Sequence, residues 1–86
     1  MEIHPSARKH GIHDDAIRHA TERYAYTAEI DADEAPERVL YIGPDRAGNL
    51  LEVVVIARDD GSELAIHAMR MRKSYRSLLP RQEDQT

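Results

Sequence analysis

The sequence contains no cysteine and no long apolar run. Without cysteine, the chain has no disulfide framework and no thiol chemistry. The opening stretch MEIHPSARKHG lacks the apolar segment of a signal peptide. No apolar run approaches the roughly 20 residues that a membrane helix needs. We therefore expect a cytoplasmic protein with no membrane partner.

Several catalytic motifs are also missing. The sequence has no glycine-rich phosphate loop, no Gly-x-Ser-x-Gly turn and no His-Glu-x-x-His pair. His10 and His13 are close enough in sequence to suggest a metal pair, but Gly11 is expected to break the helix between them. No other group of ligands accompanies them. We therefore predict neither a metal site nor a cofactor.

Charge is distributed unevenly along the chain. The formal net charge is −4, yet residues 29–37 hold five acids and no base, whereas residues 70–81 hold five bases and no acid. A local basic patch attracts phosphate within a Debye length of about 10 Å, even on an acidic protein. The alternative is that both segments are simply solvated surface.

A length of 86 residues with 41% hydrophobic residues indicates one domain that folds alone. Pro5 opens a short helical turn that ends at Gly11. A second helix is predicted from about His13 to Tyr24, with an apolar stripe of Ile17, Ala20 and Tyr24. The boundaries expected are a domain over residues 1–79 and a disordered tail over residues 80–86.

The second half of the chain predicts strands. Residues 38–43, 50–58 and 63–68 are rich in strand-forming residues, with a fourth, short strand at 26–30. Residues 59–62 predict a hairpin turn with Asp-Gly at its centre.

A two-residue loop at this hairpin would set the register. On one face, Ala57 would lie opposite Leu64, Val55 opposite Ile66 and Val53 opposite Ala68. On the other face, Arg58 would lie opposite Glu63 and Val54 opposite His67. Glu52 then becomes a diagonal neighbour of His67, within side-chain reach.

The last element is predicted to be a helix that begins near Met69 or Arg70 and stops before Pro80. Its apolar positions, Met71, Tyr75 and Leu78, should pack inward. The expected fold class is therefore α+β: two N-terminal helices, a three- to four-stranded antiparallel sheet and a C-terminal helix.

Three segments in this order resemble the BrnT-type toxins of bacterial type II toxin–antitoxin systems. They are RKHGI followed by DDAIRHA, then YIGPDRAGNLLEVVVIA, and finally IHAMRMRKSYRSLL. The similarity spans roughly residues 6–79. The chain departs from that family at two positions: Met69 stands where an arginine is usual, with Arg70 one step later, and His67 replaces a hydroxyl residue.

The resemblance implies a RelE-like fold and a metal-independent endoribonuclease. It also implies an RNA substrate and a protein antitoxin, usually of the ribbon-helix-helix type that binds DNA. Lys9 and His10 are motif positions of the family and become candidate RNA-binding residues. The sequence leaves a homodimer open.

RNA cleavage without a metal needs a base, an acid and cations around the phosphorus. A histidine titrates near neutral pH, and arginine matches phosphate oxygens bidentately. The predicted catalytic set is thus His67, Glu52, Arg70 and Arg72, with Glu52 orienting His67 or acting as a base itself. Lys73 and Arg76 are predicted to bind RNA.

Each residue also has a plain structural interpretation. His67 could be an ordinary surface residue of a strand, Lys9 and His10 could merely stabilise a helix end, and the spacing of Tyr75 places it in the core. The alternative function is a non-catalytic interaction module, an inactive toxin-like protein that acts only in a repressor complex with its antitoxin. In that case Arg72 and Arg76 should pair with acids of the same chain or lie at a dimer interface.

Overall fold

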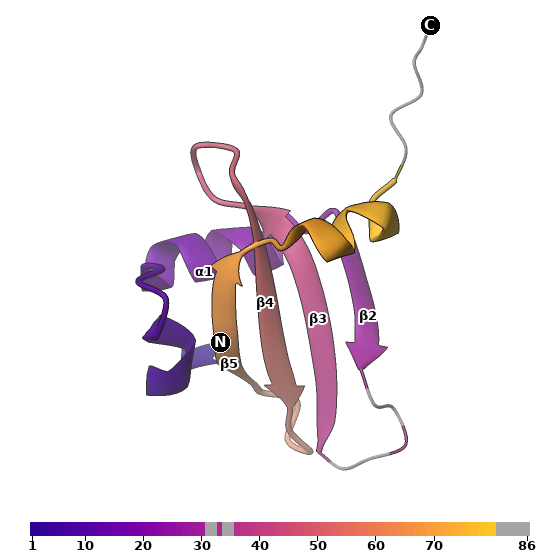
Figure 1. Ribbon diagram of the computed structural model, residues 1–86. Helices are drawn as coiled ribbons and strands as arrows, with labels where there is room; N and C mark the ends of the chain where they lie inside the picture. Colours follow the sequence, from indigo (N-terminus) through magenta and orange to yellow (C-terminus); the bar gives the residue numbers. More distant parts are fainter. Residues whose placement is uncertain (31–32, 34–35, 81–86) are drawn as a thin grey trace, which may run out of the picture.

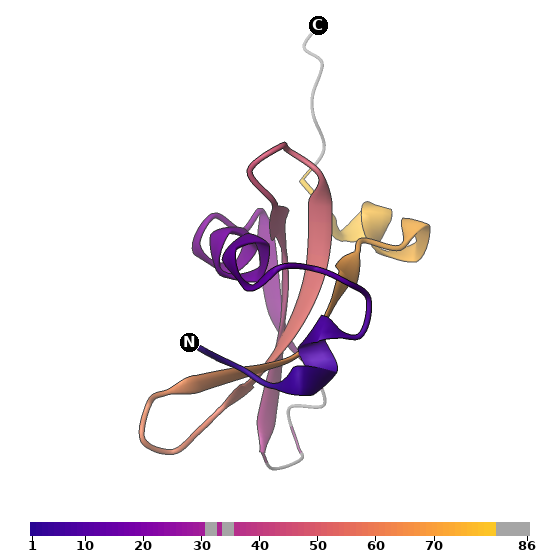
Figure 2. The same ribbon diagram turned by 90° about the vertical axis from the view of Figure 1, so that its left-hand side faces the viewer.

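The computed structural model describes residues 1–30, 33 and 36–80. These residues form a single sheet of five strands with helical segments on both faces (Figures 1 and 2). The strands are β1 (Glu2–Ile3), β2 (Tyr26–Ile30), β3 (Glu37–Pro44), β4 (Leu50–Ala57) and β5 (Glu63–Arg70). The helical segments are the 3-10 helix η1 (Pro5–Arg8), the α-helix α1 (Asp14–Glu22) and the 3-10 helix η2 (Lys73–Leu78).

The spatial order of the strands is β1-β5-β4-β3-β2. Strands β2 to β5 follow one another as an antiparallel meander, whereas β1 pairs in parallel with β5. Figure 2 shows α1 on one face of this sheet and η2 on the other. The α1 face holds the main core; the η2 face holds the residues of the candidate site.

The expected fold class, with two N-terminal helices, three or four antiparallel strands and a C-terminal helix, is wrong. The first expected helix is only the 3-10 turn η1, the sheet is mixed, and the last segment is the 3-10 helix η2. The backbone of β5 explains the last difference. This strand continues to Arg70, and the Met71 N–H then donates to the Leu50 carbonyl at 3.0 Å. Arg72 is also extended, so the helical segment begins only at Lys73 and runs for six residues.

The helix α1 lies close to its predicted position. Asp14 and Asp15 occupy its first turn, where acids suit the helix dipole. Ile17 and Ala20 are fully buried against the sheet, as predicted. Tyr24 lies beyond the helix end and is 49% exposed, so the predicted stripe is one residue too long.

The core fills the space between α1, η1 and the sheet. Its buried members are Ile3, Ala7, Ile17, Ala20, Leu51, Val53, Val55, Ala65 and Ala68. Their burial removes apolar surface from water, which is the main favourable term in folding. Because β4 supplies three of these residues and is the middle strand of the sheet, its other side chains are held rigidly on the η2 face.

The register of the β4–β5 hairpin is partly as predicted. Val53 lies opposite Ala68 and Val54 opposite His67, which confirms the predicted pairing beside the candidate site. Beyond this point the prediction is wrong, because a bulge interrupts the ladder between Val54 and Val55.

The bulge leaves Ile66 without a direct partner in β4, so Val55 pairs with Ala65. The extra residue changes which side chains face the core, and Ala65 becomes fully buried. The connection is also longer than two residues: it spans residues 58–62, closed by a bond from the Arg58 N–H to the Ser62 carbonyl at 2.9 Å.

The hairpin ends therefore pair differently from the prediction. Ala57 lies opposite Glu63 rather than Leu64. Arg58 forms an ion pair with Glu2 at 2.8 Å instead of with Glu63, and Glu63 accepts a hydrogen bond from the Tyr41 hydroxyl at 3.0 Å.

The acidic segment 29–37 and the tail fall partly outside the described residues, at 31–32, 34–35 and 81–86. Among the residues that the structure describes, no helix has the length and apolarity needed to cross a membrane.

The contact between α1 and β3 gives a first prediction. A Cβ at Gly43 would lie 2.1 Å from the Ala20 carbonyl oxygen, which is backbone and cannot turn away. Gly43→Ala should lower the free energy of unfolding by about 3 kcal/mol or more, measured by urea denaturation. The matched control is Gly61→Ala, where nothing lies within 4 Å and the cost is confined to a φ of 89°, about 1–2 kcal/mol. Equal losses in the two variants would contradict this account of the α1–β3 contact.

Candidate functional site

The most unusual residue in the structure is Glu52, in the middle of β4. Its exposed fraction is 0%, and it shares the η2 face with the buried Ile42 of β3, which lies directly opposite. Burying an isolated carboxylate is strongly unfavourable unless it is paired and hydrogen-bonded. The surroundings of Glu52 therefore need to supply several donors.

Arg72 and His67 supply these donors. The Arg72 backbone N–H donates to Oε1 of Glu52 at 3.0 Å, and its guanidinium donates to Oε2 through Nη2 at 2.7 Å. Nε of Arg72 lies 3.2 Å from both oxygens. Nε2 of His67 lies 3.0 Å from Oε2. Both carboxylate oxygens are thus occupied.

These bonds determine the charge of Glu52. Burial raises the pKa of Glu52, but the hydrogen bonds from Arg72 and His67 outweigh burial and hold the pKa below its ordinary value of 4.5. At neutral pH the side chain is an acceptor with its lone pairs already engaged. Of the two roles predicted for Glu52, the geometry favours orienting its neighbours over acting as a base.

His67 is held in a defined orientation by Glu52. Because a carboxylate only accepts hydrogen bonds, Nε2 of His67 carries the proton of this bond. In the neutral ring, Nδ1 is then the acceptor, and no hydrogen bond to Nδ1 is found among the described residues. The His67 side chain is 30% exposed, so this nitrogen belongs to a ring that a ligand can reach.

A second imidazole lies beside His67. The rings of His10 and His67 are 5.9 Å apart between centroids and nearly perpendicular, at 79°. The segment around η1 brings His10 there, because it is anchored to β5: the Ser6 hydroxyl donates to the Ile66 carbonyl at 2.7 Å. Gly11, with φ of 78°, then turns the chain away towards α1.

Arg72 stands on the solvent side of this group. Nε and Nη2 face Glu52, whereas 55% of the side chain is exposed. Its guanidinium carbon lies 5.4 Å from the centre of the Tyr75 ring, within the range of a cation–π contact. Tyr75 is thus half-buried beside Arg72, not a core residue as its spacing predicted.

We call His10, Glu52, His67 and Arg72 the histidine–arginine cluster. Glu52 and His67 were predicted from the hairpin. Arg72 was predicted from the basic segment, and His10 from the N-terminal motif. The sequence did not reveal the Arg72 backbone N–H as a ligand of Glu52. It also missed the contact with Tyr75, whose apolar spacing concealed it.

Arg70 does not join the cluster, although it was predicted in the same catalytic set. It lies directly opposite Leu51 in the β4–β5 ladder. Since Leu51 belongs to the core on the α1 face, Arg70 projects on the opposite side of the sheet from Glu52. Alternation along the strand accounts for this separation.

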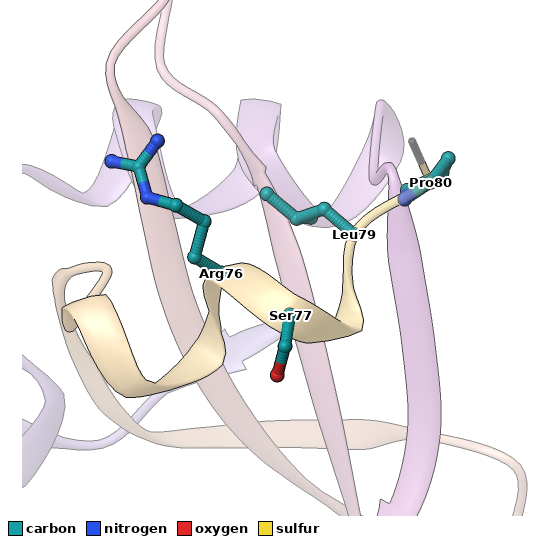
Figure 3. Close-up of a pocket in the computed structure, with 4 residues that line it drawn as sticks. All are labelled: Arg76, Ser77, Leu79 and Pro80. Atoms are coloured by element: carbon teal, nitrogen blue, oxygen red, sulfur yellow. The ribbon is translucent and has the colours of Figure 1, made fainter. Parts of the chain in front are cut away.

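The remaining candidates lie on the surface. Lys9 precedes His10, while Lys73 and Arg76 belong to η2, and all three are exposed. Arg76 lines a shallow hollow with Ser77, Leu79 and Pro80, which Figure 3 shows. The inward packing predicted for this segment is incomplete, because Leu78 is 38% exposed.

The described residues contain no group of three or more histidine, cysteine or acidic side chains placed to hold a metal ion. In comparisons with known proteins, no family model, curated protein or solved structure matches this chain. The cluster is therefore interpreted from its own geometry.

The low pKa of Glu52 predicts a pH dependence of stability. A group whose pKa is depressed on folding stabilises the protein above its unfolded pKa, and this contribution is lost as the pH falls through the folded pKa. Glu52→Gln should therefore lower the free energy of unfolding by about 2 kcal/mol at neutral pH. The difference from the wild type should shrink as the pH falls below 4.5.

Urea denaturation between about pH 3 and pH 7 measures this difference. The control is Glu37→Gln, which changes an exposed acid at the start of β3 and should alter stability by no more than about 0.5 kcal/mol. If the difference in free energy of unfolding between Glu52→Gln and the wild type stays constant down to the lowest pH, the carboxylate charge contributes nothing to stability.

Proposed function

We propose that the histidine–arginine cluster cleaves RNA without a metal, by attack of the substrate's own 2′-hydroxyl on the adjacent phosphorus. The single observation that carries this proposal is the placement of two imidazoles 5.9 Å apart beside an arginine whose side chain is 55% exposed. Such a reaction needs a base, an acid and a cation for the developing phosphorane charge, and the cluster contains all three.

In this proposal His67 is the general base. Its Nδ1 takes the proton of the 2′-hydroxyl, while the bond from Nε2–H to the Glu52 carboxylate stabilises the imidazolium that forms. In serine proteases a carboxylate likewise orients an imidazole base and stabilises the imidazolium, although there the carboxylate bonds to Nδ1 and Nε2 is the base. The O2′–P bond forms as the proton leaves.

His10, protonated, is the general acid. It gives its proton to the departing 5′-oxygen as the P–O5′ bond breaks, which leaves a 2′,3′-cyclic phosphate and a 5′-hydroxyl. The Arg72 guanidinium, whose Nε and Nη2 are bonded to Glu52, retains its outward Nη1 donors for the non-bridging phosphate oxygens. Glu52 acts here as a positioning residue.

The biological setting that we propose is the toxin component of a type II toxin–antitoxin pair. The sequence resemblance to BrnT-type toxins suggests this setting. It also suggests the partner, a protein antitoxin of the ribbon-helix-helix or a similar DNA-binding type. The exposed Arg72, Lys73 and Arg76 are compatible with a surface that such a partner covers.

One observation favours the alternative, a non-catalytic interaction module. Arg72 pairs with Glu52 of its own chain, as that alternative predicted. The pair occupies only part of the guanidinium, however, so it does not remove Arg72 from a role in phosphate binding.

RNA cleavage in the presence of EDTA tests the proposal. His67→Ala and His10→Ala should each reduce the cleavage rate by at least about a hundredfold, and the wild-type products should end in cyclic phosphate. Arg72→Lys preserves a partner for Glu52 but removes the outward donors, and should also slow cleavage. The matched control is His13→Ala, an exposed histidine before α1 whose side chain makes no capping bond.

Ribosomes are added in a parallel assay, since some RNA substrates are presented only there. Cleavage by the two histidine variants at the wild-type rate would place the reaction elsewhere. A wild-type protein that is inert with and without ribosomes would favour the interaction module.

A further inference from the structure

A second basic surface lies on the other side of the chain segment that carries Arg72. The turn between β3 and β4, the end of β5 and η2 together form a hollow of about 330 Å³. Its lining residues are Gly48, Asn49, Leu50, Arg70, Met71 and Arg76. The proposed reaction uses none of them.

The two arginines reach the hollow from different elements. Arg70 comes from the last position of β5, and Arg76 from η2. Figure 3 shows the Arg76 side chain on the same side of η2 as Leu79 and opposite to Ser77. Arg76 also lines the hollow beside the β3–β4 turn. Neither arginine forms an ion pair within the described part of the chain. Their guanidinium donors are therefore available to an anion.

The turn that forms the opposite wall is held by several hydrogen bonds. The Asp45 carboxylate accepts hydrogen bonds from the Ala47 and Asn49 N–H groups, at 3.0 and 2.8 Å. Arg46 binds Asp15 at 2.8 Å, and His19 binds the Pro44 carbonyl at 2.7 Å, so α1 holds the turn from behind. A wall fixed before binding lowers the entropic cost of holding a ligand.

Asp45 is also the acid that faces Arg70 from this turn. The Asp45 oxygens accept hydrogen bonds from the turn itself. Asp45 therefore lowers the positive charge of the hollow but does not accept a hydrogen bond from either arginine. Gly48 leaves the rim open, since a Cβ there would meet nothing within 4 Å. Leu50 and Met71 add apolar surface, which suits a sugar or base edge.

We propose that this hollow is a second phosphate subsite, which binds a backbone phosphate of single-stranded nucleic acid next to the phosphate held at Arg72. The inference rests on the proposed function and names how the substrate is held. Residues 70–76 carry both sites: Arg72 faces the histidine–arginine cluster, while Arg70 and Arg76 face the turn. One extended strand that crosses this segment contacts both.

Binding of uncleavable 2′-deoxy oligonucleotides tests the subsite independently of catalysis. A deoxydinucleotide, with two deoxynucleosides joined by one phosphate, fills only the Arg72 site, whereas a longer deoxy oligonucleotide also reaches the hollow. Arg70→Ala/Arg76→Ala should weaken the longer ligand about tenfold or more and leave the one-phosphate ligand unchanged. The slope of log affinity against log salt should fall by about 0.7 for each phosphate that the variant no longer neutralises. The control is Arg23→Ala/Arg38→Ala, two exposed cations outside both sites.

Three results would overturn the inference: equal binding of both ligands by the wild type, unchanged binding of the longer ligand by the double variant, or equal weakening by the control. Inorganic phosphate can also be tested as a competitor at constant ionic strength. If it displaces the longer ligand as effectively as unlabelled oligonucleotide does, the hollow is only a site for free anions and the inference is overturned. Strong binding without cleavage would refute the proposed function but support the subsite. RNA cleavage by the wild type, together with unchanged oligonucleotide binding by Arg70→Ala/Arg76→Ala, would support the proposed function and overturn the subsite.

Discussion

The ion pair between the buried carboxylate of Glu52 and the partly exposed Arg72 is the interaction on which the rest of the candidate site depends. A carboxylate with no exposed surface in the central strand is costly, and its donors come from the chain that follows β5. The pair therefore fixes where the backbone goes after the sheet ends. It also fixes the His67 ring, which donates to the same carboxylate.

This constraint explains why the C-terminal segment is not an α-helix. The Arg72 backbone is extended, with φ of −76° and ψ of 149°, so that both its N–H and its guanidinium reach Glu52. A helix that began at Met69 or Arg70 would have its residue-72 N–H turned along the helix axis. The carboxylate would then be short of one donor. The hydrogen bonds that the buried Glu52 needs from Arg72 thus override the helical spacing of Met71, Tyr75 and Leu78.

The sequence predicted the parts that depend on local pattern. Helix α1, the β4–β5 hairpin and the diagonal contact of Glu52 with His67 follow from the period of apolar residues. The bulge at Ile66 is not encoded in that period, because it arises where η1 binds the Ile66 carbonyl. The two-residue strand β1 is too short for any pattern, and its pairing depends on contact with distant β5. For the same reason the approach of His10 to His67 was visible only as a motif position. Arg70 was grouped with the catalytic residues because the helix was expected to begin near it, whereas β5 extends to Arg70 and alternation turns it to the other face.

A double-mutant cycle on Glu52 and Arg72, followed by urea denaturation, tests the central claim most directly. Arg72→Ala leaves a buried carboxylate without its main partner, so it should destabilise the wild-type chain strongly. In a Glu52→Gln background that cost disappears, and Arg72→Ala should then have little effect. If Arg72→Ala causes the same decrease in stability in both backgrounds, the two residues are not coupled, and the account of a site organised by Glu52 is wrong.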